Sequence, residues 1–120
     1  MRVLLVDDDE LVRLALMEML SDAGYEVVET GDPVDALGLP EHLGPPDVLI
    51  TDIDLHSELN GFEVASYAHQ LWPKVRIILV SGLPADHVHA RQPLDPRDRF
   101  IQKPLSADRL LGTIAQLAAD

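Results

Sequence analysis

Short apolar runs recur along this chain, and stretches with helical periodicity separate them. The first run, at residues 3–6, is continuous and does not alternate with polar residues. A strand with one face in water alternates, whereas a continuous apolar strand is typical of a parallel sheet buried on both faces. On this pattern the sequence predicts strands at residues 3–6, 25–28, 47–51, 75–80 and 99–102.

The stretches between these runs are predicted to be helices. Apolar residues repeat at helical spacing from Glu10 until Gly24, a plausible stop. Asp32 can cap a short helix that has Pro33 in its first position. The other helices are expected between Gly61 and Pro73, near residues 85–91 and after Ser106, and the predicted apolar faces hold Val12, Ala15, Leu16, Met19, Leu20, Val64, Ala68, Leu71, Leu110, Ile114, Leu117 and Ala118.

Strict alternation of strands and helices places the chain in the α/β class. Parallel strands need a crossover connection, and the crossover helices cover the sheet. A length of 120 residues fits one domain. We therefore expect a doubly wound, five-stranded parallel sheet with helices on both faces, forming a single domain over residues 1–120 with no effector domain in this chain.

The net charge makes some classes of binding partner unlikely. The chain has 9 Lys and Arg against 21 Asp and Glu, a formal charge of −12. Such a surface repels phosphate backbones and anionic lipid, so neither nucleic-acid binding nor membrane binding is expected. The absence of Cys excludes disulfides, thiol nucleophiles and Cys-ligated zinc. Met1-Arg2 leads into acidic residues and not into a signal peptide, so the expected location is cytoplasmic.

Charged and hydroxyl side chains follow four of the five predicted strands. In parallel sheets, ligands bind beyond the carboxyl ends of the strands, so these residues are candidates for one site. The candidates are Asp7, Asp8 and Asp9 after the first strand, Asp52 and Asp54 around the third, Ser81 after the fourth and Lys103 after the fifth.

This set of residues suits the transfer of a phosphoryl group. Crowded carboxylates repel one another by about 1 kcal/mol per pair at ~4 Å in water, which a bound cation relieves. Oxygen ligands at a site that admits phosphate favour Mg²⁺. A carboxylate can then act as the nucleophile, while the metal and Lys103 neutralise charge on the phosphoryl oxygens.

Each of these residues also has a structural interpretation. Asp9 is placed to cap the helix that starts at Glu10, and one of Asp7 and Asp8 could do the same. Ser81-Gly82 is consistent with a turn, and Lys103-Pro104 with the start of a helix. It is their shared position at one sheet edge that favours a functional site.

With these residues in view, the chain resembles the receiver domain of two-component response regulators, over essentially its whole length. The resemblance implies a CheY-like, flavodoxin-like (βα)5 fold with strand order 2-1-3-4-5. The motifs that carry it are Val-Leu-Leu-Val-Asp-Asp-Asp at residues 3–9, Asp-Val-Leu-Ile-Thr-Asp-Ile at 47–53, Asn-Gly-Phe-Glu at 60–63, Leu-Val-Ser-Gly at 79–82 and Phe-Ile-Gln-Lys-Pro at 100–104.

The resemblance assigns a role to each candidate. It makes Asp52 the phosphate acceptor, supplied by a phosphohistidine on a sensor histidine kinase or a histidine phosphotransfer protein. It also implies a Mg²⁺ site formed by Asp7, Asp8, Asp52 and the backbone carbonyl of Asp54. Lys103 would pair with the phosphoryl oxygens. Such a domain catalyses its own phosphorylation and slow dephosphorylation but is not otherwise an enzyme.

The same resemblance implies a switch. Ser81 would hydrogen-bond the phosphoryl group, and Phe100 would turn into the space that the Ser81 loop vacates. Phe100 has no hydroxyl, so this switch would depend on packing. The Lys103-Pro104 peptide bond is expected to be cis. The output partner is unspecified, and the expected state is a monomer or weak dimer.

Two segments depart from the family pattern. Gly61 lies nine residues after Asp52, one more than in most receivers, and His56 stands where many receivers have Pro. Asp54 could tune the lifetime of the phosphoryl group or be a solvated loop acid, and His56 is expected to face solvent.

Residues 84–96 contain prolines and mixed charges, so one or two helical turns at 85–91 and an unusual output surface are expected. His87 and His89 make a poor metal pair, because residues two apart on a helix point in different directions.

Two other functions remain alternatives. Asp52-Ile53-Asp54 with a downstream Ser and Lys suggests a Mg²⁺-dependent phosphohydrolase of the haloacid-dehalogenase-like kind, although that family places its Asp-x-Asp after the first strand and adds a cap. A pseudo-receiver that binds a protein without phosphorylation is the other.

Overall fold

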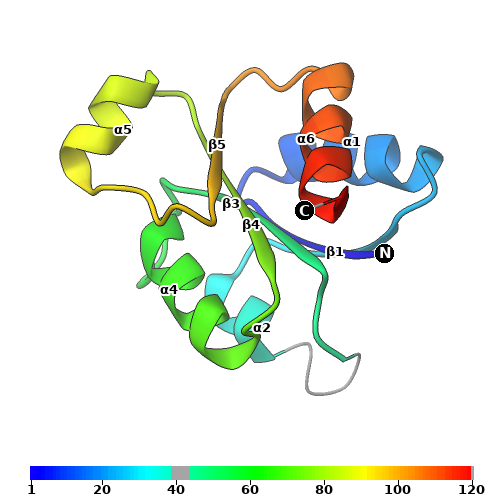
Figure 1. The fold of residues 1–120 in the computed structure, drawn as a ribbon, viewed down its shortest axis with the longest axis horizontal. Coiled ribbons are helices and arrows are strands. Elements are labelled where there is room, and N and C mark those ends of the chain that lie inside the picture. The colour runs from blue at the N-terminus through cyan, green and yellow to red at the C-terminus, as the bar shows by residue number, and fades with distance from the viewer. Residues whose placement is uncertain (39–43, 120) are drawn as a thin grey trace.

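The computed structural model describes residues 1–38 and 44–119 and contains one parallel sheet (Figure 1). The strand order is β2-β1-β3-β4-β5, which confirms the expected doubly wound topology. All four neighbouring pairs of strands are parallel. The strands are β1 (Arg2–Val6), β2 (Glu26–Thr30), β3 (Val48–Asp52), β4 (Arg76–Ser81) and β5 (Arg99–Gln102).

Five helices are present in the described residues, and they cover both faces of the sheet (Figure 1). α1 and α6 lie together on one face, and α2 and α4 lie on the other. The bounds are α1 (Glu10–Asp22), α2 (Pro33–Gly38), α4 (Gly61–Leu71), α5 (Ala85–Arg91) and α6 (Ala107–Ala119). None of these helices is long and apolar enough to cross a membrane.

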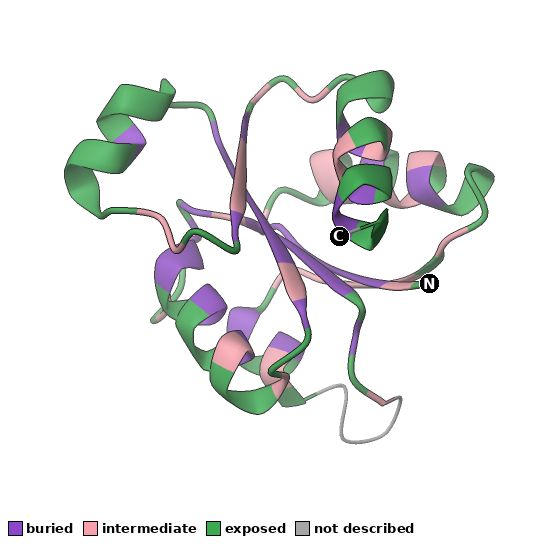
Figure 2. Cartoon of the chain, in the orientation of Figure 1, coloured by how far each residue is buried: buried purple, intermediate pink, exposed green. Residues whose placement is uncertain are grey.

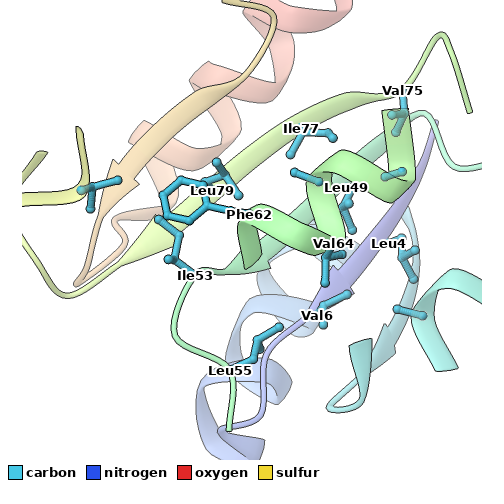
Figure 3. Close-up of a cluster of buried hydrophobic side chains, with 14 residues drawn as sticks. Leu4, Val6, Leu49, Ile53, Leu55, Phe62, Val64, Val75, Ile77 and Leu79 are labelled. Carbon is cyan, nitrogen blue, oxygen red and sulfur yellow. The ribbon is translucent and has the colours of Figure 1, made fainter. Parts of the chain in front are cut away.

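Successive residues of each central strand point into two different hydrophobic cores. Along β1, Val3 and Leu5 pack toward α1 and α6, whereas Leu4 and Val6 pack toward α2 and α4 (Figure 3). Figure 2 shows the central strands as largely buried along their length. Burial on both faces is the reason that the strands appear in the sequence as continuous apolar runs.

Side-chain caps start the helices where the sequence predicts them. Asp9 accepts hydrogen bonds from the amides of Leu11 and Val12 at the start of α1. Asp32 accepts from the amide of Val34 in α2, and the Ser106 hydroxyl accepts from that of Arg109 in α6. Each cap satisfies an amide that has no partner within its own helix.

Some details differ from the sequence prediction. The second strand starts at Glu26 and extends to Thr30, whereas residues 25–28 were expected. Three residues predicted on buried helix faces, Ala15, Leu71 and Ala118, are exposed, Leu71 at 55%. Leu71 and Ala118 lie in the last turn of their helices, and in α1 only Leu16 and Leu20 are buried, so the buried stripe of each helix is narrower than the periodicity suggests.

α5 is a short helix with few attachments, as the prolines around it predict. Val88 is its single buried residue, and Pro84 at its N-cap provides no side-chain hydrogen bond. In Figure 1, α5 stands away from α4, beyond the edge strand β5. The helix is thus less firmly packed than α1, α4 or α6.

Gly61 lies against the backbone of Asp52 and Ile53, with no room for a side chain. A Cβ there would lie 2.4 Å from the Asp52 carbonyl oxygen and 2.6 Å from the Ile53 Cα. Gly61→Ala is therefore expected to lower the free energy of unfolding by about 2–3 kcal/mol, measured by urea denaturation.

Gly112 in α6 provides the matched control, because a Cβ there meets nothing within 4 Å. Gly112→Ala is expected to raise the free energy of unfolding by about 0.5–1 kcal/mol, through helix propensity and the entropy of the unfolded chain. Equal stability of the two variants would contradict the tight approach at Gly61.

Candidate functional site

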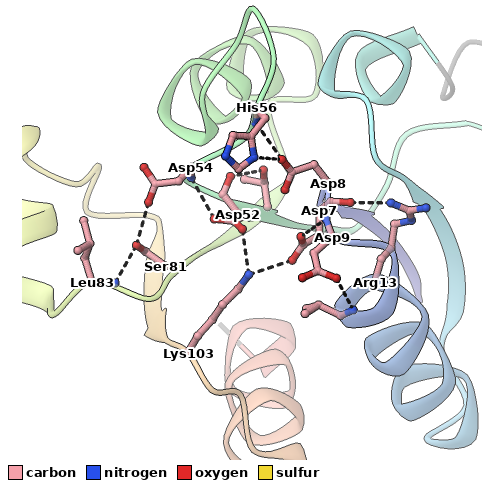
Figure 4. A network of polar contacts seen from close by, with 12 residues as sticks. Asp7, Asp8, Asp9, Arg13, Asp52, Asp54, His56, Ser81, Leu83 and Lys103 are labelled. Carbon is pink, nitrogen blue, oxygen red and sulfur yellow. Dashed lines mark hydrogen bonds and ion pairs between the residues drawn. The ribbon is translucent and has the colours of Figure 1, made fainter.

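The carboxyl edge of the sheet brings together side chains from three separate strands (Figure 4). The Nζ of Lys103 lies 2.9 Å from an oxygen of Asp52 and 3.2 Å from an oxygen of Asp7. Asp7 follows β1, Asp52 ends β3 and Lys103 follows β5. The Lys103-Pro104 peptide bond is cis, as expected. One ammonium group therefore links two acids that are far apart in the sequence.

Asp8 completes a cluster of three carboxylates. Asp7, Asp8 and Asp52 each offer one oxygen, and these oxygens lie within 4.8 Å of one another. Asp7 is only 2% exposed, and the oxygen that does not contact Lys103 accepts a hydrogen bond from the amide of Asp9. The donor set fits Mg²⁺, which prefers carboxylate oxygens and water.

Burial dominates the electrostatics of Asp7. It raises the pKa of the carboxyl, and the hydrogen bond from Asp9 and the charge of Lys103 offset this in part. Burial alone would lower the pKa of Lys103, but its hydrogen bond and charge interaction with Asp52 raise it above the usual value. Lys103 is therefore charged in the site at all physiological pH values.

The His56 ring faces solvent, as expected, but it also contacts this cluster, which the sequence did not predict. The ring is 92% exposed, but its Nδ1 lies 2.5 Å from an oxygen of Asp8, and the His56 amide donates to the same oxygen at 2.9 Å. Burial would raise the pKa of Asp8, but the hydrogen bonds from His56 lower it. The hydrogen bond from Asp8 in turn raises the pKa of the His56 ring.

Asp54 connects the site to α5. Its amide donates to Asp52 at 3.0 Å, which places the Asp54 backbone beside the predicted acceptor. Its two carboxylate oxygens accept from the Ser81 hydroxyl at 3.3 Å and from the Arg91 guanidinium at 2.7 Å (Figure 4 shows the Ser81 contact). Arg91 was not a candidate from sequence, because its distance of 37 residues from Asp54 leaves no local signal.

The two predicted switch residues lie on neighbouring strands. Ser81 is buried at the end of β4, and its hydroxyl also accepts from the amide of Leu83 at 3.1 Å. Phe100 in β5 is partly buried against the core that contains Phe62 and Leu79. Ser81 is thus engaged with Asp54, and Phe100 with core packing.

A second polar cluster, which the sequence analysis missed, lies away from this edge. The Nε2 of His69 lies 2.8 Å from a carboxylate oxygen of Asp98, and the Asp98 side chain is buried. Burial raises the pKa of Asp98, and the hydrogen bond to His69 opposes that shift. His87 and His89 belong to no group of metal-ligating side chains in the described part of the chain.

A family model described as the response regulator receiver domain matches residues 3–115. The chain belongs to this family. It is 31% identical to the sensor kinase CckA of Brucella abortus over 116 residues, and this match covers 96% of the present chain but only 12% of the kinase. It is 29% identical over 123 residues to the polar-differentiation response regulator DivK of Brucella ovis, covering 98% of this chain and 96% of DivK.

Solved structures agree with this assignment. A response regulator receiver protein from Sinorhizobium medicae superposes with a TM-score of 0.87 at 25% identity, covering 98% of this chain and 94% of that one. The receiver domain of the hybrid histidine kinase CckA gives a TM-score of 0.81 at 25% identity, covering 98% of both chains. The matched part makes up only 12% of CckA, and a match over 54% of this chain makes up 31% of the transcriptional regulatory protein PdtaR of Mycobacterium tuberculosis.

The raised pKa of Asp7 predicts a pH-dependent stability difference. The folded protein binds a proton at Asp7 more tightly than the unfolded chain does, so this contribution to stability is complete below the unfolded pKa near 3.8 and is lost as pH rises through the raised pKa. In Asp7→Asn this dependence is absent. The free energy of unfolding of the variant relative to wild type is therefore expected to be larger at neutral pH than near pH 4.

Urea denaturation across this pH range measures the difference, with Glu18→Gln, a neutralised acid on an exposed part of α1, as control. The control is expected to show no such trend. A difference for Asp7→Asn that stays constant or falls with pH would contradict the burial argument.

Proposed function

We propose that this receiver domain is a phospho-accepting switch in which Asp52 receives a phosphoryl group from a phosphohistidine. The observation that supports this most directly is the ammonium group of Lys103 between Asp7 and Asp52, with Asp8 beside them. A carboxylate oxygen of Asp52 forms a bond to phosphorus while the phosphorus–nitrogen bond breaks. The electron pair stays on the imidazole nitrogen of the donor, which takes up a proton.

The residues of the chain have separate tasks in this reaction. Lys103 neutralises negative charge on the phosphoryl oxygens, and it is already held at the acceptor carboxylate. Asp7 and Asp8, with Asp52 and the Asp54 carbonyl, would hold Mg²⁺. The bound ion supplies positive charge that offsets the carboxylates and orients the phosphoryl oxygens.

The proposed switch starts from the contacts of Ser81. Its hydroxyl donates to Asp54 before phosphorylation, so it has to leave Asp54 to donate to the phosphoryl group on Asp52. Asp54 also holds Arg91 of α5, so a change at Asp54 reaches that helix directly. Phe100 then responds by repacking, because it has no hydroxyl to exchange.

The proposed partners are a sensor histidine kinase or a histidine phosphotransfer protein, and an output protein of unspecified class. Leu11 and Leu14 are exposed apolar side chains in the first turns of α1, the helix that follows Asp7 and Asp8 in the chain, and we propose them as part of the surface for the phosphohistidine partner. The weakly packed α5, with its mixed charges, is the proposed output surface. The proposed oligomeric state is a monomer or weak dimer.

Family membership favours this function over the phosphohydrolase alternative. Asp52 ends β3, the third strand of the chain, whereas the haloacid-dehalogenase-like arrangement has its Asp-x-Asp after the first. The proposal is favoured over the pseudo-receiver alternative because the residues to which it gives roles lie at one edge of the sheet, namely Asp7, Asp8, Asp52, Ser81 and Lys103.

Phosphorylation by a small donor tests the proposal. The protein is incubated with acetyl phosphate, with Mg²⁺ or with chelator, and its intact mass is measured beside that of Asp52→Asn. The expected result is a Mg²⁺-dependent gain of one phosphoryl group that is absent from the variant, because the amide nitrogen of Asn is not a nucleophile at this pH. A gain that persists in Asp52→Asn would overturn the assignment of the acceptor.

Asp54→Ala tests the proposed effect of Asp54 on phosphoryl lifetime. Removing this carboxylate deprives an attacking water of an acceptor and frees Ser81 and Arg91 to donate to the phosphoryl group. We expect dephosphorylation to slow by about tenfold, which is less than the effect of a full general base. Decay of the phosphorylated mass after removal of donor gives the rate.

Two variants control this measurement. Asp54→Asn keeps a polar group beside Ser81 but removes the charge, and Glu58→Ala removes an exposed acid from the same loop. Slowing is expected in Asp54→Asn and not in Glu58→Ala. An unchanged rate in Asp54→Ala would show that Asp54 does not tune the lifetime of the phosphoryl group.

A further inference from the structure

A histidine and two aspartates converge between α4 and the connection that leads from α5 to β5 (Figure 1). His69 lies near the C-terminal end of α4, and Asp95 and Asp98 lie in the connection. Each offers one atom that could bind a metal, and these atoms lie within 4.8 Å of one another. Of the two such groups in the described residues, this one alone contains an imidazole.

A tight turn places the two acids on the same side of the connection. The Asp98 amide donates to the Asp95 carbonyl at 2.9 Å, and Pro96 stands in the second position of this turn, where its fixed φ fits. The Asp95 carboxylate also accepts from the Arg97 amide at 2.9 Å. The backbone therefore holds the acids together, independently of their contact with His69.

The contact between His69 and Asp98 lies in the interior. The side chains are 11% and 4% exposed, and the Nε2 of His69 lies 2.8 Å from a carboxylate oxygen of Asp98. Burial raises the pKa of Asp98 in spite of this hydrogen bond and the charge of Arg97, so the groups nearby compensate the buried acid only in part. The other ring nitrogen, Nδ1, is buried with no hydrogen-bond partner in the described residues, so no second hydrogen bond fixes the ring.

A cavity adjoins all three side chains. Its volume is about 430 Å³, and Phe62 and Leu79 form part of its wall. A single water molecule occupies about 30 Å³ in the liquid, so the cavity has room for an ion and for the water that would complete its coordination.

We propose that His69, Asp95 and Asp98 form a second metal site, separate from the carboxyl edge of the sheet, that binds a divalent transition ion of the Zn²⁺ type. Zn²⁺ binds imidazole nitrogen and carboxylate oxygen together, often through three protein ligands and one water. Mg²⁺ prefers oxygen ligands and gains little from an imidazole. An ion here would crosslink α4 to the connection between α5 and β5.

The distances require only a small adjustment. Two ligands of a tetrahedral Zn²⁺ ion lie about 3.4 Å apart, from bond lengths of about 2.1 Å. The contact of 2.8 Å between His69 and Asp98 would open slightly around an ion, and Asp95 would move inward. Arg97 pairs with Asp95, but its side chain is 53% exposed, so it can turn toward solvent, and exposed ion pairs of this kind are weak.

The test is calorimetric titration of the full chain with Zn²⁺ and with Mg²⁺. We expect His69→Gln and Asp95→Asn each to weaken Zn²⁺ binding at one site at least about tenfold, since even a change beside a ligand costs about 10- to 100-fold. Binding of Mg²⁺ is expected to change less than about threefold, because the imidazole adds little for this ion. Asp95 is 33% exposed, so Asp95→Asn tests the site without disturbing the core.

His89→Gln is the matched control, because it removes an exposed imidazole of α5 that belongs to no group of metal-ligating side chains in the described residues. This variant is expected to bind Zn²⁺ as wild type does. A Zn²⁺ affinity that is unchanged in either His69→Gln or Asp95→Asn would overturn the proposed three-ligand site.

Nuclear magnetic resonance identifies the ligand in the unaltered protein. Zn²⁺ is expected to shift the ring nitrogen resonances of His69, both in wild type and in Asp8→Asn, and to leave those of His87 and His89 in place. Resonances of His69 that do not move would overturn the proposal. So would a response that disappears in Asp8→Asn, because it would show that the ion binds at the carboxyl edge. Neither measurement involves phosphoryl transfer, so these failures leave the proposed switch intact.

Discussion

The charge balance around Lys103 is the interaction on which the rest of this site depends. Parallel strands place Asp7 and Asp52 at one edge, and burial makes their mutual repulsion costly. The ammonium group contacts both acids and offsets that repulsion in the absence of any other cation. The carboxylate of Asp52, the proposed acceptor, therefore lies beside a positive charge before any phosphoryl donor binds.

Much of this arrangement could be predicted from the sequence, because the relevant signals are local. Continuous apolar runs indicated strands buried on both faces, and the residue that follows each run had to lie at the carboxyl edge. The caps Asp9, Asp32 and Ser106 were also predictable, since each acts on amides two or three residues away. The predicted burial of Ala15 and Leu71 was wrong, because periodicity indicates which side of a helix is apolar but not how much of that side the neighbouring elements cover.

The side-chain partners that were missed are all non-local. The contact between His56 and Asp8 spans 48 residues, that between Arg91 and Asp54 spans 37, and that between His69 and Asp98 spans 29. Each depends on the path of a loop or on the placement of α5, and neither hydrophobic periodicity nor motif spacing specifies these. The sequence therefore predicted which residues lie at the ends of the strands, but not which side chains from loops and from α5 contact them.

The loose attachment of α5 has a thermodynamic consequence for signalling. One buried valine, the ion pair of Arg91 with Asp54 and the stacking of Arg91 over the Phe62 ring at 5.8 Å are the described links between this helix and the rest of the domain. A protein that binds α5 only when this helix is displaced from Asp54 binds more tightly when the ion pair between Arg91 and Asp54 is weakened. Linkage is reciprocal, so the same protein alters the free energy of the modified acceptor by an equal amount. In the proposed switch, a protein that binds α5 would thus also shift the equilibrium between the phosphorylated and the unphosphorylated domain.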